Sequence, residues 1–377
     1  MVRRTLTCLA FAAAPTLVAA PALACGGLIG PRGSVNLIRT STLAGYHSGI
    51  EHYVTSFTFT GQGGGKFGSI VPLPGVPSNV ERGGDWTLQR LEREVTPVSE
   101  GSAAGSAALV PAPLPEVLLE AKIDALDITV LKGGGAEVAR WARANGFTLS
   151  PDAPEVLDFY AARSPIFMAA RFNQARAQAR GQLAGDGTPI HVTIPTPTPW
   201  VPLRILGLGK QPQETIDADV FLLTDRAPSI LPVPSNVGAR GAPTVQGITI
   251  ERSESADVSL LRDLHADKGM GWVPTKGMWF SYLKISTPAS VLRNDLAIDA
   301  SGAGHPSFLA AGFGHVSGIT IPPIVNRIVQ RVVLEGPLST PVPARSRLPD
   351  ISAALLLGTS IGALAGFRLR RHRVSTT

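Results

Sequence analysis

Apolar and polar residues alternate with a period close to two along most of the chain, a pattern that predicts β-strands. In the stretch 50–60, Phe57 and Phe59 fall on one face, and the glycine-rich turn 61–65 separates this stretch from the next apolar run. A hairpin is therefore expected here. The strands predicted along the chain are 35–43, 50–60, 66–73, 116–131, 166–172, 190–194, 201–208, 219–224, 277–286 and 324–334.

Four shorter segments place their apolar residues at helical spacing instead. In 85–95, Trp86, Leu88 and Leu91 recur along one side, and Asp85 is a suitable N-cap. The other predicted helices are 137–145, 154–163 and 255–265, the last with Ser255 as its cap. The whole pattern predicts an α+β fold with β-rich mixed sheets and a few short helices, followed by one C-terminal transmembrane helix.

Segments rich in proline, glycine and small residues interrupt these elements. Residues 99–115 contain only Ser, Ala, Gly, Pro, Leu and Val besides Glu100, which marks either a flexible insertion or a boundary between two subdomains. The prolines in 195–202 exclude a central paired strand and favour a sheet edge or a polyproline conformation. The polar stretch 176–182 is expected to be a surface insertion.

The C-terminal end has the pattern of a membrane anchor. Residues 351–367 carry no charge, and seventeen helical residues span roughly 25 Å, the short end of what crosses a bilayer. We predict a transmembrane helix at 350–367 and a basic cytoplasmic tail at 368–377, because basic residues beside a span are retained inside. The arginines that stop transfer are Arg368, Arg370, Arg371 and Arg373.

Three glycines recur at every fourth residue of this span: Gly358, Gly362 and Gly366. Such a small-residue face lets two helix backbones pack closely, which predicts a homodimer through the membrane helix. The alternative is that glycine is simply common in this chain. A second alternative is a processed C-terminal sorting signal, although no LPxTG motif is present.

The N-terminal end predicts export. Arg3 and Arg4 precede the apolar stretch 6–20, and small residues before Cys25 suit cleavage after Ala24. Residues 1–24 are therefore expected to be a signal peptide and 25–345 an exported domain. Cys25 would begin the mature chain, either as a free thiol or as a lipid attachment point.

Targeting segments account for the high isoelectric point. Of 34 lysines and arginines, two lie in the signal and four in the tail, which leaves 28 against 27 acidic residues in 25–349. The exported body is thus nearly neutral, so nucleic-acid binding is not expected. Because Cys8 is removed with the signal, the mature chain is expected to form no internal disulfide.

No group of residues indicates a metal or cofactor site. His47 and His52 are five residues apart, which on one strand places them on opposite faces and suits joint metal ligation poorly. His305 and His315 lie in glycine-rich loops without cysteine or clustered carboxylates nearby. Neither a catalytic group, a metal nor a cofactor is therefore predicted. The tryptophans could stack on sugars, but core packing is the commoner role for them: Trp86, Trp141, Trp200, Trp272 and Trp279.

Several short motifs in the body resemble the bacterial family known as domain of unknown function 2330. The most specific are Trp141 with Asn145-Gly146-Phe147, and Pro202-Leu203-Arg204-Ile205. The others are Cys25-Gly26-Gly27, Val71-Pro72-Leu73-Pro74, Phe159-Tyr160 and Met278-Trp279. The resemblance implies an exported, often membrane-anchored domain of uncharacterised activity, and it assigns no catalytic residue. Members often have a second cysteine after Cys-Gly-Gly, and this chain has none in 28–33.

These observations predict a single-pass cell-membrane protein whose body is extracytoplasmic and whose C-terminus is cytoplasmic. Its expected role in the cell envelope is binding or assembly without catalysis. One alternative is an extracytoplasmic hydrolase or acyl transferase that uses Cys25, with its own amine as the base. The other is a binder of cell-wall polysaccharide. The sequence leaves the ligand, the partner and the oligomeric state open.

Overall fold

The computed structural model describes residues 27–30, 33–34, 40–57, 68–95, 116–181, 188–239, 241–314 and 318–325. The chain forms two compact units, 1–329 and 330–377, and every described residue belongs to the first. The predicted signal peptide, Cys25, the 99–115 segment, the predicted span with its glycines and the arginine tail all lie outside the described residues. Within the described part, no helix is both long and apolar enough to cross a membrane.

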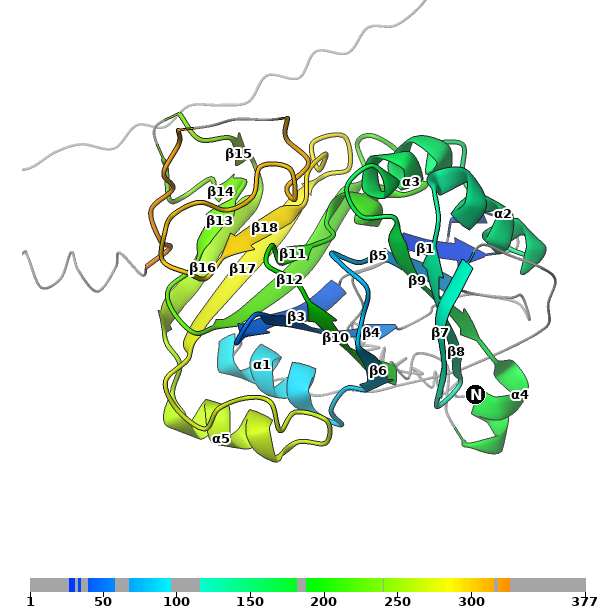
Figure 1. Cartoon of the computed structure of the whole chain (residues 1–377), viewed down its shortest axis with the longest axis horizontal. Helices are drawn as coiled ribbons and strands as arrows, with labels where there is room; N and C mark the ends of the chain where they lie inside the picture. The colour runs from blue at the N-terminus through cyan, green and yellow to red at the C-terminus, as the bar shows by residue number, and fades with distance from the viewer. Residues whose placement is uncertain are drawn as a thin grey trace, which may run out of the picture. The chain divides into compact units, whose positions relative to one another are not determined.

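Two large sheets dominate the described unit (Figure 1). One has six strands in the order β2-β1-β5-β9-β8-β7, and the other has seven in the order β16-β17-β12-β3-β4-β10-β6. Smaller sheets are β11-β18-β13 and β14-β15. The larger sheet is mixed, because β12 pairs with β3 in parallel and with β17 in antiparallel fashion. The predicted α+β class with β-rich mixed sheets is confirmed for this part of the chain.

The strands of the six-stranded sheet are β2 (Gly33–Ser34), β1 (Gly27–Gly30), β5 (Gly68–Pro72), β9 (Ile166–Phe172), β8 (Leu126–Lys132) and β7 (Glu116–Ile123). Those of the seven-stranded sheet are β16 (Ile248–Ser255), β17 (Trp279–Pro288), β12 (Thr215–Thr224), β3 (Thr40–His47), β4 (Ile50–Phe57), β10 (Thr188–Pro195) and β6 (Asn79–Arg82). The short strands are β11 (Trp200–Val201), β13 (Ser229–Leu231), β14 (Val233–Pro234), β15 (Thr244–Val245) and β18 (Leu296–Asp299).

Both faces of the two large sheets are covered, which explains why many strands are apolar throughout. Tyr53 on β4 and Met168 on β9 belong to a core cluster shared by the two sheets. The neighbouring Val54 points to the other face of β4, where it joins a cluster with Leu91 and Leu261 from two helices. A strand buried on both sides loses the alternation that would mark a half-buried strand.

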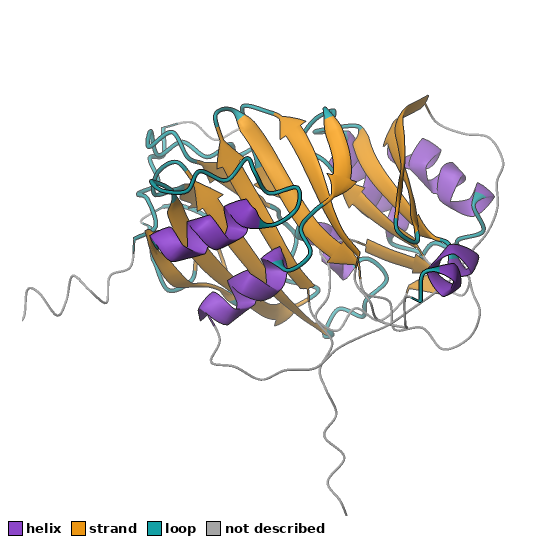
Figure 2. Cartoon of the chain, turned by 90° about the horizontal axis from the view of Figure 1, so that it is seen from below, coloured by secondary structure: helices purple, strands orange, loops and turns teal. Residues whose placement is uncertain are grey.

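Five helices occur in the described residues: α1 (Thr87–Val95), α2 (Gly135–Ala144), α3 (Ala153–Ala161), α4 (Gln174–Ala179) and α5 (Val258–Ala266), together with a 3₁₀ turn η1 (Arg204–Gly207). Helices α2 and α3 pack on the six-stranded sheet, and α1 and α5 cover the seven-stranded sheet (Figure 2). Helices α1, α2, α3 and α5 fall close to the predicted positions. Helix α4 overlaps the segment expected to be a surface insertion.

The caps of two helices differ from the prediction. The Asp267 carboxylate, not Asp85, caps the start of α1: it accepts from the amides of Asp85 (2.9 Å) and Trp86 (3.0 Å), just before the helix, and from the Thr87 hydroxyl (2.7 Å). Helix α5 begins after Asp257, whose side chain accepts from the Ser259 amide at 2.6 Å. A cap supplied from 180 residues away cannot be read from local sequence.

Several strand predictions require correction. The segment 116–131 is two strands joined by a turn, at which Asp124 has a φ of 47°. Segment 201–208 is mostly the turn η1, because Pro202 cannot donate to a strand ladder and the residues after it pack as a turn. Residues 324–325 are not a strand, and 326–334 lie outside the described residues. Strand β16 escaped prediction because its outward residues make it polar, as suits an edge.

The prolines of β10 lie near its two ends, although the strand is not at the sheet edge, because it pairs with β4 over 188–195 and with β6 over 190–193. Strand β6, the last strand of the sheet, pairs only with residues 190–193 of β10. Pro189 and Pro195 lie just outside that paired segment, where the missing amide hydrogen costs no ladder hydrogen bond.

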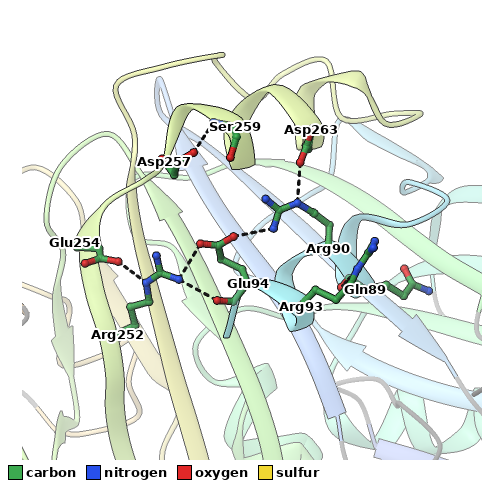
Figure 3. Close-up of polar contacts among 9 residues, drawn as sticks. All are labelled: Gln89, Arg90, Arg93, Glu94, Arg252, Glu254, Asp257, Ser259 and Asp263. Atoms are coloured by element: carbon green, nitrogen blue, oxygen red, sulfur yellow. Dashed lines mark hydrogen bonds and ion pairs between the residues drawn. The ribbon is translucent and has the colours of Figure 1, made fainter. Parts of the chain in front are cut away.

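An ion-pair network ties α1 to α5 and β16 (Figure 3). Glu94 on α1 lies between Arg90, at 2.7 Å, and Arg252 of β16, at 2.8 Å. Arg90 also contacts Asp263 of α5 at 2.8 Å, and Arg252 pairs with Glu254. Every charge in this network has an opposite partner, so it fastens the two helices to the sheet edge.

Candidate functional site

The β3–β4 hairpin carries four polar residues of interest: Tyr46, His47, Glu51 and His52. Its two-residue turn has positive φ at Ser48 (52°) and Gly49 (81°), the arrangement of a tight primed turn. The turn pairs His47 with Ile50 and Gly45 with His52 across the hairpin. His47 and His52 therefore share one face of the sheet, and the prediction of opposite faces was wrong because it assumed a single strand.

His52 forms a buried pair with a histidine from the neighbouring strand. His52 Nδ1 lies 2.9 Å from His191 Nε2, and the two residues are 6% and 2% exposed. Trp272 stacks on His52 with ring centroids 3.9 Å apart and planes 2° from parallel. The indole lies directly over Gly45, where any Cβ would come within 2.0 Å of Trp272 Cη2. Glycine is required here by close approach.

Burial keeps this histidine pair neutral. It lowers the pKa of His52 to about 3, helped by the neighbouring His191 and His47. Burial also lowers the pKa of His191, against the opposing charge of Glu81, whose Oε1 lies 3.3 Å from His191 Nδ1 without hydrogen-bond geometry. Two neutral rings joined by one hydrogen bond act here as a packing unit beneath Trp272. Among the described residues, no three His, Cys, Asp or Glu side chains gather to hold a metal.

A second buried polar cluster centres on Asp295. Its Oδ1 accepts hydrogen bonds from the Tyr160 hydroxyl at 2.7 Å and from the amides of Leu203 (2.8 Å) and Arg204 (3.0 Å). Its Oδ2 pairs with Arg163 Nη2 at 2.6 Å. This cluster, which we call the Asp295 hub, therefore joins α3 to the loop that follows β11 and to the start of β18.

The pKa shifts and hydrogen bonds around Asp295 indicate a structural role for this cluster. Burial raises the pKa of the Asp295 carboxyl, although Arg163 and the hydrogen bonds oppose the rise. Burial and the nearby Asp295 also raise the pKa of Tyr160. The Tyr160 oxygen in turn accepts from the Ile205 amide at 2.9 Å. Each of these polar atoms is engaged inside the protein, so none is free to meet a substrate.

An open pocket lies beside the tip of the β3–β4 hairpin. It holds about 90 Å³ and is lined by Tyr46, Pro197, Thr198, Pro199, Ile298, Asp299, Ala300, Ser301, His305 and Ser307. We call it the Tyr46 pocket. The Tyr46 hydroxyl donates to the Thr196 carbonyl at 3.0 Å, which fixes the ring against the proline-rich loop.

Asp299 builds one wall of the Tyr46 pocket. Its Oδ1 accepts from the amide and hydroxyl of Ser301 at 2.8 and 2.6 Å, and its Oδ2 accepts from the His305 amide at 2.8 Å. Burial by itself would raise the pKa of Asp299, but these hydrogen bonds lower it overall. The carboxylate thus stays ionised and holds its loop in shape.

A buried carboxyl group lies behind this pocket. Glu51, opposite Tyr46 in the hairpin register, is fully buried, and its Oε2 accepts from the Trp200 amide at 3.3 Å. Its Oε1 has no hydrogen-bond partner among the described residues. Burial raises the pKa of Glu51 well above its ordinary value.

Comparison with known families places the chain. A family model described as an uncharacterized protein conserved in bacteria, DUF2330, matches residues 19–227. The chain belongs to this bacterial family. The matched DUF2330 region contains the β3–β4 hairpin, both buried histidines and Tyr160, whereas Asp295 and Asp299 lie beyond it. The resemblance inferred from the short motifs is confirmed.

Solved structures similar to this DUF2330 member are distant. Baculovirus p35 aligns with a TM-score of 0.37 and 9% identity, covering 71% of this chain and 97% of p35. A mutated baculovirus p35 after caspase cleavage aligns with a TM-score of 0.34 and 8% identity, covering 69% and 99%. No curated protein matches the sequence.

The structure brings together some of the residues considered from sequence and separates others. His305 lines the Tyr46 pocket, whereas His315 lies outside the described residues. Trp141 and Trp200 are buried, as expected for core residues. The DUF2330 motif residues Tyr160 and Leu203 meet at the Asp295 hub.

Sequence reasoning missed the carboxylates that organise these clusters, namely Glu51, Asp295 and Asp299. Each stands alone among unrelated neighbours in the sequence, and a single acidic residue in a polar segment usually marks solvent exposure. The only signal was indirect: Asp295 and Asp299 flank the apolar run 296–298, which with Asp299 forms β18.

Proposed function

We propose that this DUF2330 protein is an exported, membrane-anchored binding protein of the cell envelope that works without catalysis. We propose further that it engages its ligand through the Tyr46 pocket. The observation that carries this proposal is the pocket itself, an open recess lined by hydroxyl groups, a carboxylate and proline walls.

The size of the Tyr46 pocket favours binding of one group of a larger ligand. Sites that enclose a whole small molecule usually measure roughly 300–1,000 Å³. This recess holds about 90 Å³. A wall polymer or a protein that inserts one side group would fit such a recess while the rest of the ligand stays outside.

The state of the buried ionisable groups favours binding over catalysis. His52 pairs with His191 beneath Trp272, and Asp295 is held by Arg163 and Tyr160. A general acid or base must reach a substrate proton within hydrogen-bond distance. His52, His191 and Asp295 make their hydrogen bonds to other residues of the protein, so these groups are not placed to reach a substrate proton.

The proposed location rests on the two ends of the sequence. A signal peptide at 1–24 and a span at 350–367 with Arg368, Arg370, Arg371 and Arg373 after it would hold the body outside the cytoplasmic membrane, with Gly358, Gly362 and Gly366 forming a dimer face. Protease added to intact spheroplasts should digest the body and leave a short membrane-protected fragment. A body that resists protease until the cells are lysed would refute this topology.

Filling the pocket should abolish ligand binding. Thr198 is exposed at the rim, so Thr198→Trp adds an indole to the recess without burying a polar group. With purified full-length protein, sedimentation with isolated cell walls should fall at least tenfold for this variant. The matched control is Val258→Trp, which adds the same side chain at a 42% exposed position on α5.

The control variant should bind walls like the unchanged protein. If Thr198→Trp also binds like the unchanged protein, the Tyr46 pocket is not where the ligand is held, and the proposal fails. If the unchanged protein does not sediment with walls, the wall is not the ligand.

A further inference from the structure

The polar atoms of the Tyr46 pocket are mainly acceptors. The Tyr46 hydroxyl already donates its hydrogen to the Thr196 carbonyl, so toward any further polar group its oxygen acts as an acceptor. Asp299 contributes an ionised carboxylate, and three hydroxyl groups complete the polar lining. They belong to Thr198, Ser301 and Ser307.

Besides the His305 imidazole, the rest of the lining is apolar, and the lining contains neither lysine nor arginine. Pro197, Pro199, Ile298 and Ala300 form the walls, and the Tyr46 ring adds an aromatic face. A cation near the face of a tyrosine ring is attracted by the negative charge of the ring's π-system. An alkyl chain, in turn, packs favourably on proline and isoleucine.

Acidic side chains lie near the Tyr46 hydroxyl. The pKa of Tyr46 is raised first by burial and then by the charges of Glu51, Asp225 and Asp299. Asp225 is the partner of His47, with 2.6 Å between Asp225 Oδ1 and His47 Nδ1. Nearby acidic groups therefore make it unfavourable to place another negative charge here and favourable to place a positive one.

We propose that the group received by the Tyr46 pocket is a primary ammonium on an aliphatic stem, as in a lysine-type side chain of a wall peptide. This inference rests on the proposed binding function and specifies its ligand. The ammonium would lie against the Tyr46 ring, with the Asp299 carboxylate as its counter-charge and the hydroxyl oxygens of Thr198, Ser301 and Ser307 as acceptors for its hydrogens. The stem would lie on the proline walls.

Changing Arg226 tests whether the group that enters the Tyr46 pocket carries a positive charge. Its Nη1 lies 3.4 Å from the Ser301 carbonyl, outside the pocket lining, and its side chain is exposed. Arg226→Gln removes a positive charge near the pocket without changing its walls. An ammonium should then bind about twofold more tightly at low salt. The affinity for a neutral group should not change in this variant, and the affinity for an anion should fall.

The experiment uses purified full-length protein and titration calorimetry with three probes that share the same backbone and the same four-carbon stem. They are N-acetyl-lysine methylamide, its ε-acetylated form and N-acetyl-norleucine methylamide. We expect the lysine probe to bind at least tenfold more tightly than the other two, Thr198→Trp to abolish this binding, Val258→Trp to leave it intact and Arg226→Gln to strengthen it.

The outcomes separate this inference from the function on which it rests. If all three probes bind equally and Thr198→Trp removes all of them, the pocket binds ligands but the ammonium assignment is overturned. The same holds if Thr198→Trp abolishes wall binding while no probe binds. If Thr198→Trp changes neither wall binding nor probe binding, both the ammonium assignment and the proposed function are overturned.

Discussion

Asp295→Ala should lower the free energy of unfolding by about 3–5 kcal/mol, the largest effect expected for any single change in this protein. The carboxylate is fully buried, and it satisfies Arg163, the Tyr160 hydroxyl and two backbone amides at once. Removing it leaves the Arg163 guanidinium, whose side chain is 6% exposed, without its counter-charge. Urea denaturation at pH 7 measures the loss.

Asp263→Ala is the matched control for the Asp295 prediction. Asp263 pairs with Arg90 at 2.8 Å, but its side chain is 49% exposed, and solvent screens such a pair. The expected loss is below about 1 kcal/mol. Asp295→Asn, which keeps an acceptor and loses the charge, should fall between the two. Equal small losses for Asp295→Ala and Asp263→Ala would show that the hub does not hold α3 to the loop after β11.

Stability should also rise with pH between about 3 and 6.5 because of the buried histidine pair. In the unfolded chain His52 takes up a proton near its ordinary pKa of about 6.5, whereas burial lowers the pKa of the folded residue to about 3. Between these values the unfolded state binds more protons. Acid therefore favours unfolding, with a slope of up to about 1.4 kcal/mol per pH unit for each such histidine.

His191 contributes in the same direction, because burial lowers its pKa too. Two buried carboxyl groups act oppositely. The pKa values of Glu51 and Asp295 are raised by burial, so the folded state keeps their protons to higher pH than the unfolded state does. Their contribution to stability is present at low pH and is lost as the pH rises through the raised values.

Comparing the unchanged protein with His52→Gln separates the contribution of His52 to the pH dependence of stability from the contribution of these carboxyl groups. Free energies of unfolding are measured in urea at pH 4, 5, 6 and 7 for the unchanged protein and for His52→Gln. The pH slope of the variant should be lower by most of one proton, about 1 kcal/mol per pH unit. His305→Gln, which removes an exposed imidazole, serves as the control and should keep the original slope.

An unchanged slope in His52→Gln would show that His52 is accessible to protons in the folded protein. The fluorescence of Trp272, which stacks on His52, provides a second measurement of whether the pair stays closed in acid. Exposure of the indole at pH 5 in the folded unchanged protein would likewise contradict a neutral buried pair.

Sequence patterns determined the class of the fold and most of its helices. Amphipathic spacing located α1, α2, α3 and α5, because a helix that covers a sheet buries only one side, and that side recurs every three to four residues. Family membership was also readable, since its motifs are short and local. Strands were harder: β12 and β10 are buried on both faces, and β16 is a polar edge.

The candidate site was decided by tertiary structure. His52 and His191 are 139 residues apart, Tyr160 and Asp295 are 135 apart, and the Tyr46 pocket joins the hairpin tip to residues 298–307. Antiparallel pairing of β4 with β10 brings His52 beside His191, and antiparallel pairing of β18 with β11 brings residues 296–297 beside Trp200 and Val201, which follow the proline-rich loop.

Periodicity along a chain reports which side of an element is apolar, and it does so within a few residues. Which strand lies beside which, and which lone carboxylate meets which distant amide, depends on long-range packing and on the need to satisfy every buried polar group. The amino-acid sequence alone thus indicated a β-rich α+β member of DUF2330, and only the folded chain placed Tyr46, Asp299 and Asp295 where they act.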